Sequence, residues 1–167
     1  PIDASLESRA RKGDSDAQIR LGLKLADRST GSRYADAARW FRAAAKSGSA
    51  EARYDLAVMT AEGLGVKRDP VGAAIMFMDA ATAGFPLAEY RLGLAYQNGV
   101  GVRRDAAGAA MWFQRAARHG IPQAQSALAA LYVAGKGVKA DPVIAFSWYR
   151  VAEEHGEVAI AGRPAVL

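Results

Sequence analysis

The chain has 167 residues, of which 51% are hydrophobic, and a formal net charge of +5 at pH 7. This length and composition predict one domain with enough apolar side chains for a sizeable core. Because the chain has no cysteine, disulfides and thiolate chemistry are excluded. No run approaches the roughly 20 apolar residues of a membrane-spanning helix, so we expect no such span.

The first 13 residues predict a short amphipathic helix. Leu6 and Ala10 are four residues apart and would share one face of that helix. We expect an N-terminal capping helix over 1–13, or the remnant of a further repeat. Because the chain begins at Pro1 and not at a methionine, we also expect a fragment of a larger protein.

A glycine that recurs every 36 residues divides the rest of the chain. A fixed period of this length predicts one supersecondary unit copied several times. We assign the repeats to 14–48, 49–84, 85–120 and 121–156, all within one domain, and an apolar tail to 157–167. The tail would fold back as a cap, begin a further repeat or form an interaction surface. The period-marking glycines are Gly48, Gly84, Gly120 and Gly156.

Each repeat predicts two helices, best seen in the copy from 85 to 120. Ala88, Leu92 and Tyr96 follow each other at four-residue intervals and form one stripe of a first helix. Gly99 is expected to end that helix, and Asp105 to cap the start of a second one. The predicted fold is therefore essentially all-α, with helix pairs stacked into a solenoid. The equivalent residues elsewhere are Gly63 and Gly135, Asp69 and Asp141, with Pro70 and Pro142 at the first helical position.

The copy from Ala88 to Gly120 resembles the Sel-one-like repeat (SLR) family, a relative of the tetratricopeptide repeats. The resemblance implies a right-handed α-solenoid of antiparallel helix pairs, about four repeats long with the first copy degenerate. It also implies an adaptor that holds a protein or peptide partner in bacterial signalling, polar localisation or envelope assembly, with the periplasm or cell envelope favoured over the cytoplasm. The residues that carry it are Leu92-Gly93, Tyr96, Gly99, Gly101-Val102, Asp105, Trp112-Phe113, Ala116-Ala117 and Gly120.

The sequence predicts no catalytic residue, no cofactor and no metal site. His119 and His155 are one period apart and are expected at equivalent helix ends, where a partly cationic side chain is favourable. The Gly-x-Gly loops lack the third glycine and the preceding strand of a dinucleotide site. Cysteine-rich relatives of the family resemble β-lactam-binding proteins, so a small-ligand-binding protein or hydrolase is the alternative. We expect the tryptophans, which recur in phase with the repeat, to be core residues: Trp40, Trp112 and Trp148.

The interhelix loops carry basic pairs such as Lys67-Arg68 and Arg103-Arg104. They would form either a basic edge for an acidic partner or a solvated edge, and we favour the latter because each pair adjoins its own capping aspartate. Nucleic acid is not expected as a partner, because the loops have no aromatic side chains on which bases could stack.

In tetratricopeptide-like stacks the first helix of each pair lines the concave face, so this resemblance implies a groove for the partner. Tyr54 and Tyr90 stand one period apart and would be neighbours on its floor, where tyrosine is a common hot spot. The alternative is that both rings simply pack between helices. We also expect that the open ends of the solenoid allow self-association. The predicted groove residues are Ile19, Glu51, Tyr54, Val58, Leu87, Tyr90, Leu94, Gln97, Asn98, Gln123 and Ser126.

Overall fold

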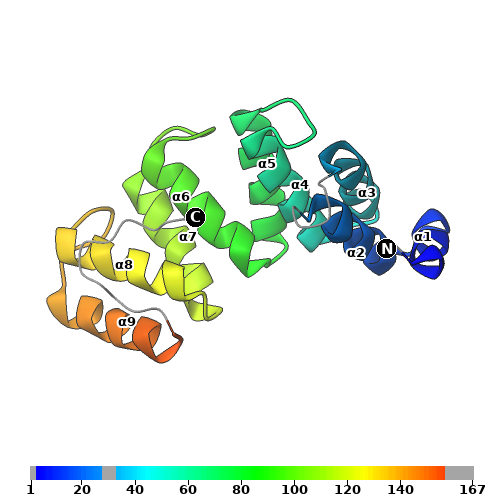
Figure 1. The fold of residues 1–167 in the computed structure, drawn as a ribbon. Helices are drawn as coiled ribbons and strands as arrows, with labels where there is room; N and C mark the ends of the chain where they lie inside the picture. The colour runs from blue at the N-terminus through cyan, green and yellow to red at the C-terminus, as the bar shows by residue number, and fades with distance from the viewer. Residues whose placement is uncertain (1–2, 28–32, 157–167) are drawn as a thin grey trace. The chain divides into compact units, whose positions relative to one another are not determined.

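The computed structural model describes residues 3–27 and 33–156, and in these ranges every regular element is a helix (Figure 1). The prediction of an all-α fold is therefore confirmed. The C-terminal tail at 157–167 and most of the first interhelix loop lie outside the described residues. The helices are α1 (Ala4–Arg11), α2 (Ser15–Ala26), α3 (Tyr34–Lys46), α4 (Ala50–Glu62), α5 (Pro70–Thr82), α6 (Pro86–Asn98), α7 (Ala106–Arg118), α8 (Pro122–Ala134) and α9 (Pro142–Glu154).

The contacts divide the chain into two compact units at Phe85 and Pro86. In unit 1, α2 pairs with α3 and α4 with α5, α3 packs on α4, and α1 packs on α2. In unit 2, α6 pairs with α7 and α8 with α9, and α7 packs on α8. We call α2, α4, α6 and α8 the first helices, and α3, α5, α7 and α9 the second helices.

The predicted helix caps are confirmed. The Asp69 carboxylate accepts a hydrogen bond from the Gly72 N–H at 2.9 Å, and the carboxylates of Asp105 and Asp141 cap α7 and α9 in the same way. At the other end of the loop, Gly63 and Gly135 take the left-handed conformation that ends α4 and α8. Local residue chemistry therefore sets where each helix begins and ends.

Each of the three loops at 63–69, 99–105 and 135–141 is closed by one further backbone hydrogen bond. The N–H of the capping aspartate donates to a carbonyl near the end of the first helix, as Asp69 does to Thr60 at 2.9 Å. Asp105 donates to Tyr96 at 2.9 Å and Asp141 to Tyr132 at 3.0 Å. The same bond in three copies holds the two helices of a pair in one geometry.

The second glycine of the loop touches the neighbouring pair. Gly65 lies against the backbone of Tyr34 and Ala35 at the start of α3, and Gly137 lies against the backbone of Ala106 at the start of α7. A Cβ at either position would overlap those backbone atoms, and both glycines have positive φ. The Gly-x-Gly pattern therefore serves contact between pairs as well as the turn itself.

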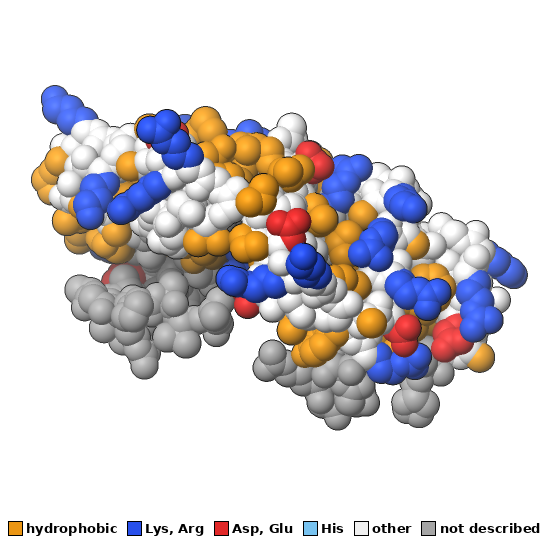
Figure 2. Space-filling model, turned by 90° about the horizontal axis from the view of Figure 1, so that it is seen from above, with side chains coloured by type: hydrophobic (Ala, Val, Ile, Leu, Met, Phe, Trp, Pro, Cys, Tyr) orange, Lys and Arg blue, Asp and Glu red, His pale blue; other side chains and the backbone are white. Residues whose placement is uncertain are grey.

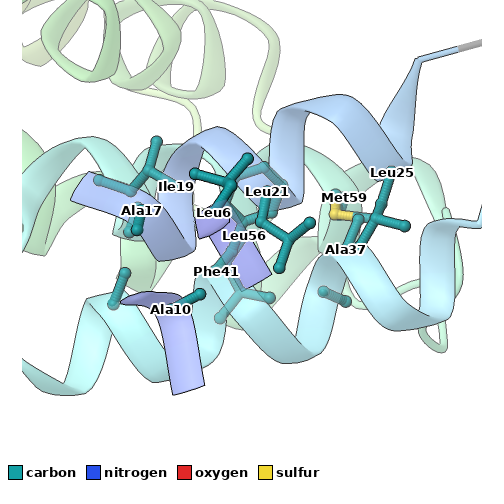
Figure 3. Packing of buried hydrophobic residues seen from close by; sticks show 13 residues of the cluster. Leu6, Ala10, Ala17, Ile19, Leu21, Leu25, Ala37, Phe41, Leu56 and Met59 are labelled. Carbon is teal, nitrogen blue, oxygen red and sulfur yellow. The ribbon is translucent and has the colours of Figure 1, made fainter. Parts of the chain in front are cut away.

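The core of unit 1 is a cluster of buried side chains from α1, α2, α3 and α4, seen at close range in Figure 3. Phe41 from α3 lies among Leu21 from α2 and Leu56 from α4, all nearly inaccessible to solvent. In unit 2, Phe113 of α7 and Leu128 of α8 belong to the equivalent cluster. The expected alanine–leucine stripe of the first helices is thus buried in both units.

Of the three tryptophans predicted to be core residues, only one is buried. Trp112 is buried, whereas Trp40 and Trp148 are half-buried and pack against the edges of their clusters. The second helix α9 buries only Ala145 and Ala152, while α7 buries both residues at the equivalent positions and four more. Residues at the same repeat position therefore differ in exposure.

Replacing Gly137 by alanine tests the contact between pairs. We expect Gly137→Ala to lower the free energy of unfolding by about 3 kcal/mol or more, because the new Cβ would overlap the backbone of α7. Gly120→Ala is the matched control: its φ is also positive, but no atom lies within 4 Å of the added Cβ, so about 1 kcal/mol is expected. Urea unfolding of both variants gives the comparison, and equal losses would contradict the role assigned to Gly137.

Candidate functional site

The first helices carry every residue predicted to line a partner-binding groove. Their buried face is occupied by the repeated alanine and leucine, for example Ala88 and Leu92, both fully inaccessible. Positions beside that stripe reach the surface to different extents. Exposed are Glu51, Leu87, Asn98 and Gln123, and half-buried are Tyr54, Val58, Tyr90, Leu94, Gln97 and Ser126.

Ile19 differs from the other predicted groove residues. Its side chain is only 8% exposed and belongs to the core cluster of unit 1 (Figure 3). The helical spacing placed it at the same repeat position as Tyr54, but in the first copy this position is covered by the core around α1 and α2. Ile19 thus offers little surface to a partner.

Tyr54 and Tyr90 are each packed on a phenylalanine within their own unit. The Tyr54 ring lies 5.8 Å from that of Phe77 and 5.1 Å from that of Phe85, measured between ring centroids. The Tyr90 ring lies 5.9 Å from that of Phe113. Both tyrosines therefore contribute to packing between helices while keeping part of their surface exposed.

A buried carboxylate in unit 2 is a feature that the sequence reasoning missed. Glu89 on α6 is 0% exposed, and the Arg115 Nε–H donates to its Oε1 at 3.0 Å. The His119 ring donates from Nδ1 to the other oxygen at 2.8 Å. The Arg115 guanidinium also lies 4.7 Å from the centre of the Trp112 ring, a cation–π distance. Both oxygens of Glu89 are thus hydrogen-bonded, one by Arg115 of α7 and the other by His119 at the C-cap of that helix.

The same repeat position holds glutamine in the copies at either end. The Gln125 amide donates to the Ala117 carbonyl at 3.0 Å, and its oxygen accepts from His155 at 3.1 Å. The Gln18 amide donates likewise to the Ala10 carbonyl at 3.0 Å. Both histidines cap second helices, as expected, but their rings bind side chains of first helices. Two features of the sequence together could have located this cluster. His119 and His155 recur one period apart, and Glu89 stands at the repeat position where the next copy has Gln125.

Asp55 on α4 is the second polar group that the sequence reasoning missed. Its Oδ2 is shielded from solvent and has no hydrogen-bond partner in the described part of the chain. Burial, and then the negative charge of Glu51 one turn earlier, raise the pKa of this carboxyl to about 7. Asp55 therefore stays largely protonated below neutral pH.

The described residues contain neither a cluster of metal ligands nor a helix that could span a membrane. In 3–27 and 33–156, no group of three or more His, Asp or Glu residues could hold a metal ion. No described helix is long and apolar enough to cross a membrane.

In the loops, the Arg68 Nε–H donates to the Ala61 carbonyl at 3.1 Å, so this basic residue helps to close the end of α4.

The raised pKa of Asp55 predicts how stability depends on pH. The unfolded chain releases this proton near the ordinary value of about 3.9, whereas the folded chain holds it up to about 7. Stability should therefore fall as pH rises from about 4 to about 7 and change no further above that range. Asp55→Asn should remove this slope and stabilise the fold at pH 8 by about 1–3 kcal/mol, since partial exposure reduces the full effect.

Urea unfolding at several pH values between 4.5 and 8 measures this effect. Glu51→Gln is the control that keeps the carboxyl but removes the neighbouring charge, so its slope should lie between those of the wild type and Asp55→Asn. The same slope in the wild type and Asp55→Asn would contradict the assignment.

Comparisons with known proteins place these features in a family. The Sel1 repeat model matches residues 15–49, 50–85, 86–121 and 122–157. The chain is similar to the crystal structure of c5321, a protective antigen of uropathogenic Escherichia coli strains displaying an SLR fold, with 34% identity and a TM-score of 0.88 over 94% of this chain and 34% of that chain. It is also similar to a Sel1 repeat protein from Oxalobacter formigenes, with 30% identity and a TM-score of 0.83 over 90% of this chain and 61% of that chain.

The chain thus spans about a third of the first of these proteins and about three fifths of the second. A search of curated proteins found no match. The predicted fold, an all-α solenoid of helix pairs, agrees with the family model and with both structures. Four consecutive matches over most of its length show that the chain belongs to the Sel1 repeat family.

Proposed function

We propose that this chain is a non-catalytic scaffold that binds a partner peptide or protein along the exposed face of its first helices. Sel1 repeat proteins generally mediate protein–protein interactions, and the repeat is generally a scaffold without catalysis. Both similar structures come from bacteria, which supports a role in bacterial signalling, polar localisation or envelope assembly.

The observation that carries this proposal is the contrast between the two faces of the first helices. At the buried face all four copies have the same residues, an alanine and then a leucine four positions later. One position before the alanine the side chains are exposed and differ, with Glu51, Leu87 and Gln123 in successive copies. The core needs side chains of fixed volume, whereas an exposed face that varies can recognise a specific partner.

The half-buried tyrosines fit this face. Tyr54 and Tyr90 are held by their phenylalanine neighbours, so little side-chain entropy would be lost when a partner covers the rest of each ring. The polar tip of tyrosine can hydrogen-bond to the partner while the ring packs against it. Val58 and Leu94 add apolar surface at a second shared repeat position.

Two exposed apolar residues of unit 2 allow a matched test. Leu87 lies on the first helix α6 and Met111 on the second helix α7, with 40% and 50% of their surfaces exposed. The partner is first identified by photocrosslinking in the native host from positions 87 and 123. We then expect Leu87→Asp to weaken its binding at least about tenfold and Met111→Asp less than about twofold, measured by calorimetry. Crosslinks from position 111 instead, or equal losses, would place the binding face elsewhere.

The exposed face of α9 supports a second role, self-association of this chain. Phe146 is 63% exposed, whereas Ala110 at the equivalent position of α7 is buried where α7 packs on α8. Val143 adds to the same apolar surface, and exposed apolar surface of this kind marks protein–protein contacts. At the other end, α1 presents mainly charged side chains such as Arg9 and Arg11. We therefore propose that two copies associate through α9.

Sedimentation equilibrium of the full chain tests this association. We expect dimers at micromolar to millimolar concentration, and Phe146→Asp should weaken the association at least about tenfold because a charge would be buried in the contact. Ile75→Asp is the control, since Ile75 is equally exposed on α5. A wild-type chain that stays monomeric throughout, or an equal effect of the control, would exclude this role for α9.

A further inference from the structure

A hollow with a volume of ≈ 520 Å³ lies in unit 1 between α1 and α3, above α2. Trp40 of α3 forms the accessible apolar part of its wall, and Leu21 and Leu25 of α2 lie at its base with only 1% and 4% of their surfaces exposed. The volume is in the range of ligand-binding clefts. The charged residues of its rim are Glu7 and Arg11 from α1, and Arg33, Asp36 and Arg39 at and within α3.

The short helix α1 accounts for the hollow. It has eight residues, whereas α3 has 13, so α1 is about 12 Å long where a full second helix is about 20 Å long. It therefore spans a shorter length of α2 than a full second helix would. The Trp40 ring is left half-buried, while Trp112 at the same repeat position in unit 2 is only 6% exposed.

The rim carries more positive than negative charge. The Asp36 carboxylate pairs with two guanidinium groups: its Oδ2 lies 2.6 Å from Arg33 Nη2 and its Oδ1 lies 3.8 Å from Arg39 Nη1. Arg11 lies 3.3 Å from Glu7. Three arginines thus share two carboxylates, which leaves one net positive charge at the hollow. Lys and Arg side chains gather with a few Asp and Glu side chains at the right of Figure 2, where α1–α3 lie.

Arg39 is the arginine best placed to meet a ligand. Its side chain is 79% exposed, and its distance to Asp36 is beyond hydrogen-bond range. A guanidinium binds a carboxylate through two parallel N–H donors, which gives both energy and orientation. An incoming carboxylate would supply the counter-charge that Asp36 provides only in part.

We propose that this hollow binds an acidic peptide segment of a partner protein. One aromatic or aliphatic side chain of the segment packs against the Trp40 ring, and a neighbouring carboxylate pairs with Arg39. This surface is separate from the exposed face of the first helices, and its test does not depend on the partner proposed for that face.

A peptide fits the hollow better than a nucleic acid does. The phosphate backbone of nucleic acid presents closely spaced negative charges, which would meet the carboxylates of Glu7 and Asp36 as well as the arginines. A peptide can alternate carboxylates with an apolar side chain and so match both the charged rim and the Trp40 ring. Affinity should remain modest, because the net charge of the rim is small.

The test uses the full chain labelled with ¹⁵N and a synthetic peptide with one phenylalanine flanked by two aspartates on each side. The indole N–H signal of Trp40, assigned with Trp40→Phe, is followed by NMR during the titration. We expect this signal to shift with a saturable dissociation constant, and Arg39→Gln to weaken binding about five- to tenfold. Arg42→Gln is the matched control, an exposed arginine of the same helix outside the lining, and should change the affinity less than about twofold.

Control ligands decide between the possible occupants. A peptide with alanine for phenylalanine, and one with lysines for the aspartates, should each bind at least about tenfold more weakly. The inference is overturned if the Trp40 signal does not move at millimolar peptide, or if Arg39→Gln and Arg42→Gln behave alike. Tighter binding of a single-stranded oligonucleotide, of inorganic phosphate or of anionic lipid vesicles at the same position would also overturn it.

Discussion

The close approach of backbone to backbone between neighbouring helix pairs is the constraint on which the structure depends. Gly65 and Gly137 press against the starts of α3 and α7, where a single methyl group would not fit. The N–H of each capping aspartate ties the same loop to its own first helix. In these two loops the contacts fix the position of the loop both within its own pair and against the preceding pair. The alanine–leucine stripe then fills the remaining space with side chains of constant size. Because side chains outside this framework do not set the spacing, they can differ between copies at little cost to the fold.

One repeat position shows how far the copies differ within this common framework. Gln18 and Gln125 use their amide groups to reach a carbonyl of the preceding helix, α1 or α7. Glu89 has no such donor when ionised, and it accepts hydrogen bonds from Arg115 and His119 instead. A buried carboxylate is costly unless it is paired and hydrogen-bonded, and here both oxygens have partners. The backbone geometry of the repeat is retained while the polar contacts that join the helices change.

The sequence predicted those parts of the fold that depend on local chemistry. The capping roles of Asp69, Asp105 and Asp141 follow from the residue type and its place before a helix, and no distant neighbour is needed to recognise them. The burial of a side chain cannot be predicted from local chemistry in this way, because it depends on which other helices cover that position. Helical spacing placed Ile19 and Tyr54 on the same face, yet only Ile19 is buried. For the same reason the sequence did not indicate that Glu89 and Asp55 are shielded, or that Trp40 lines a hollow beside a short helix.

The two surfaces of unit 1 differ in charge, and this difference gives a basis for specificity. On α4, Glu51 and the half-buried Asp55 would favour a cationic group of a partner, whereas Arg33 and Arg39 at the hollow would favour a carboxylate. The two surfaces also respond differently to pH. Asp55 gains its negative charge only as pH rises through about 7, because burial and Glu51 raise the pKa of its carboxyl. The guanidinium groups stay charged over this whole range. The charge on α4 therefore depends on pH near neutrality, whereas the charge of the arginines at the hollow does not, so pH alters the difference between the two surfaces.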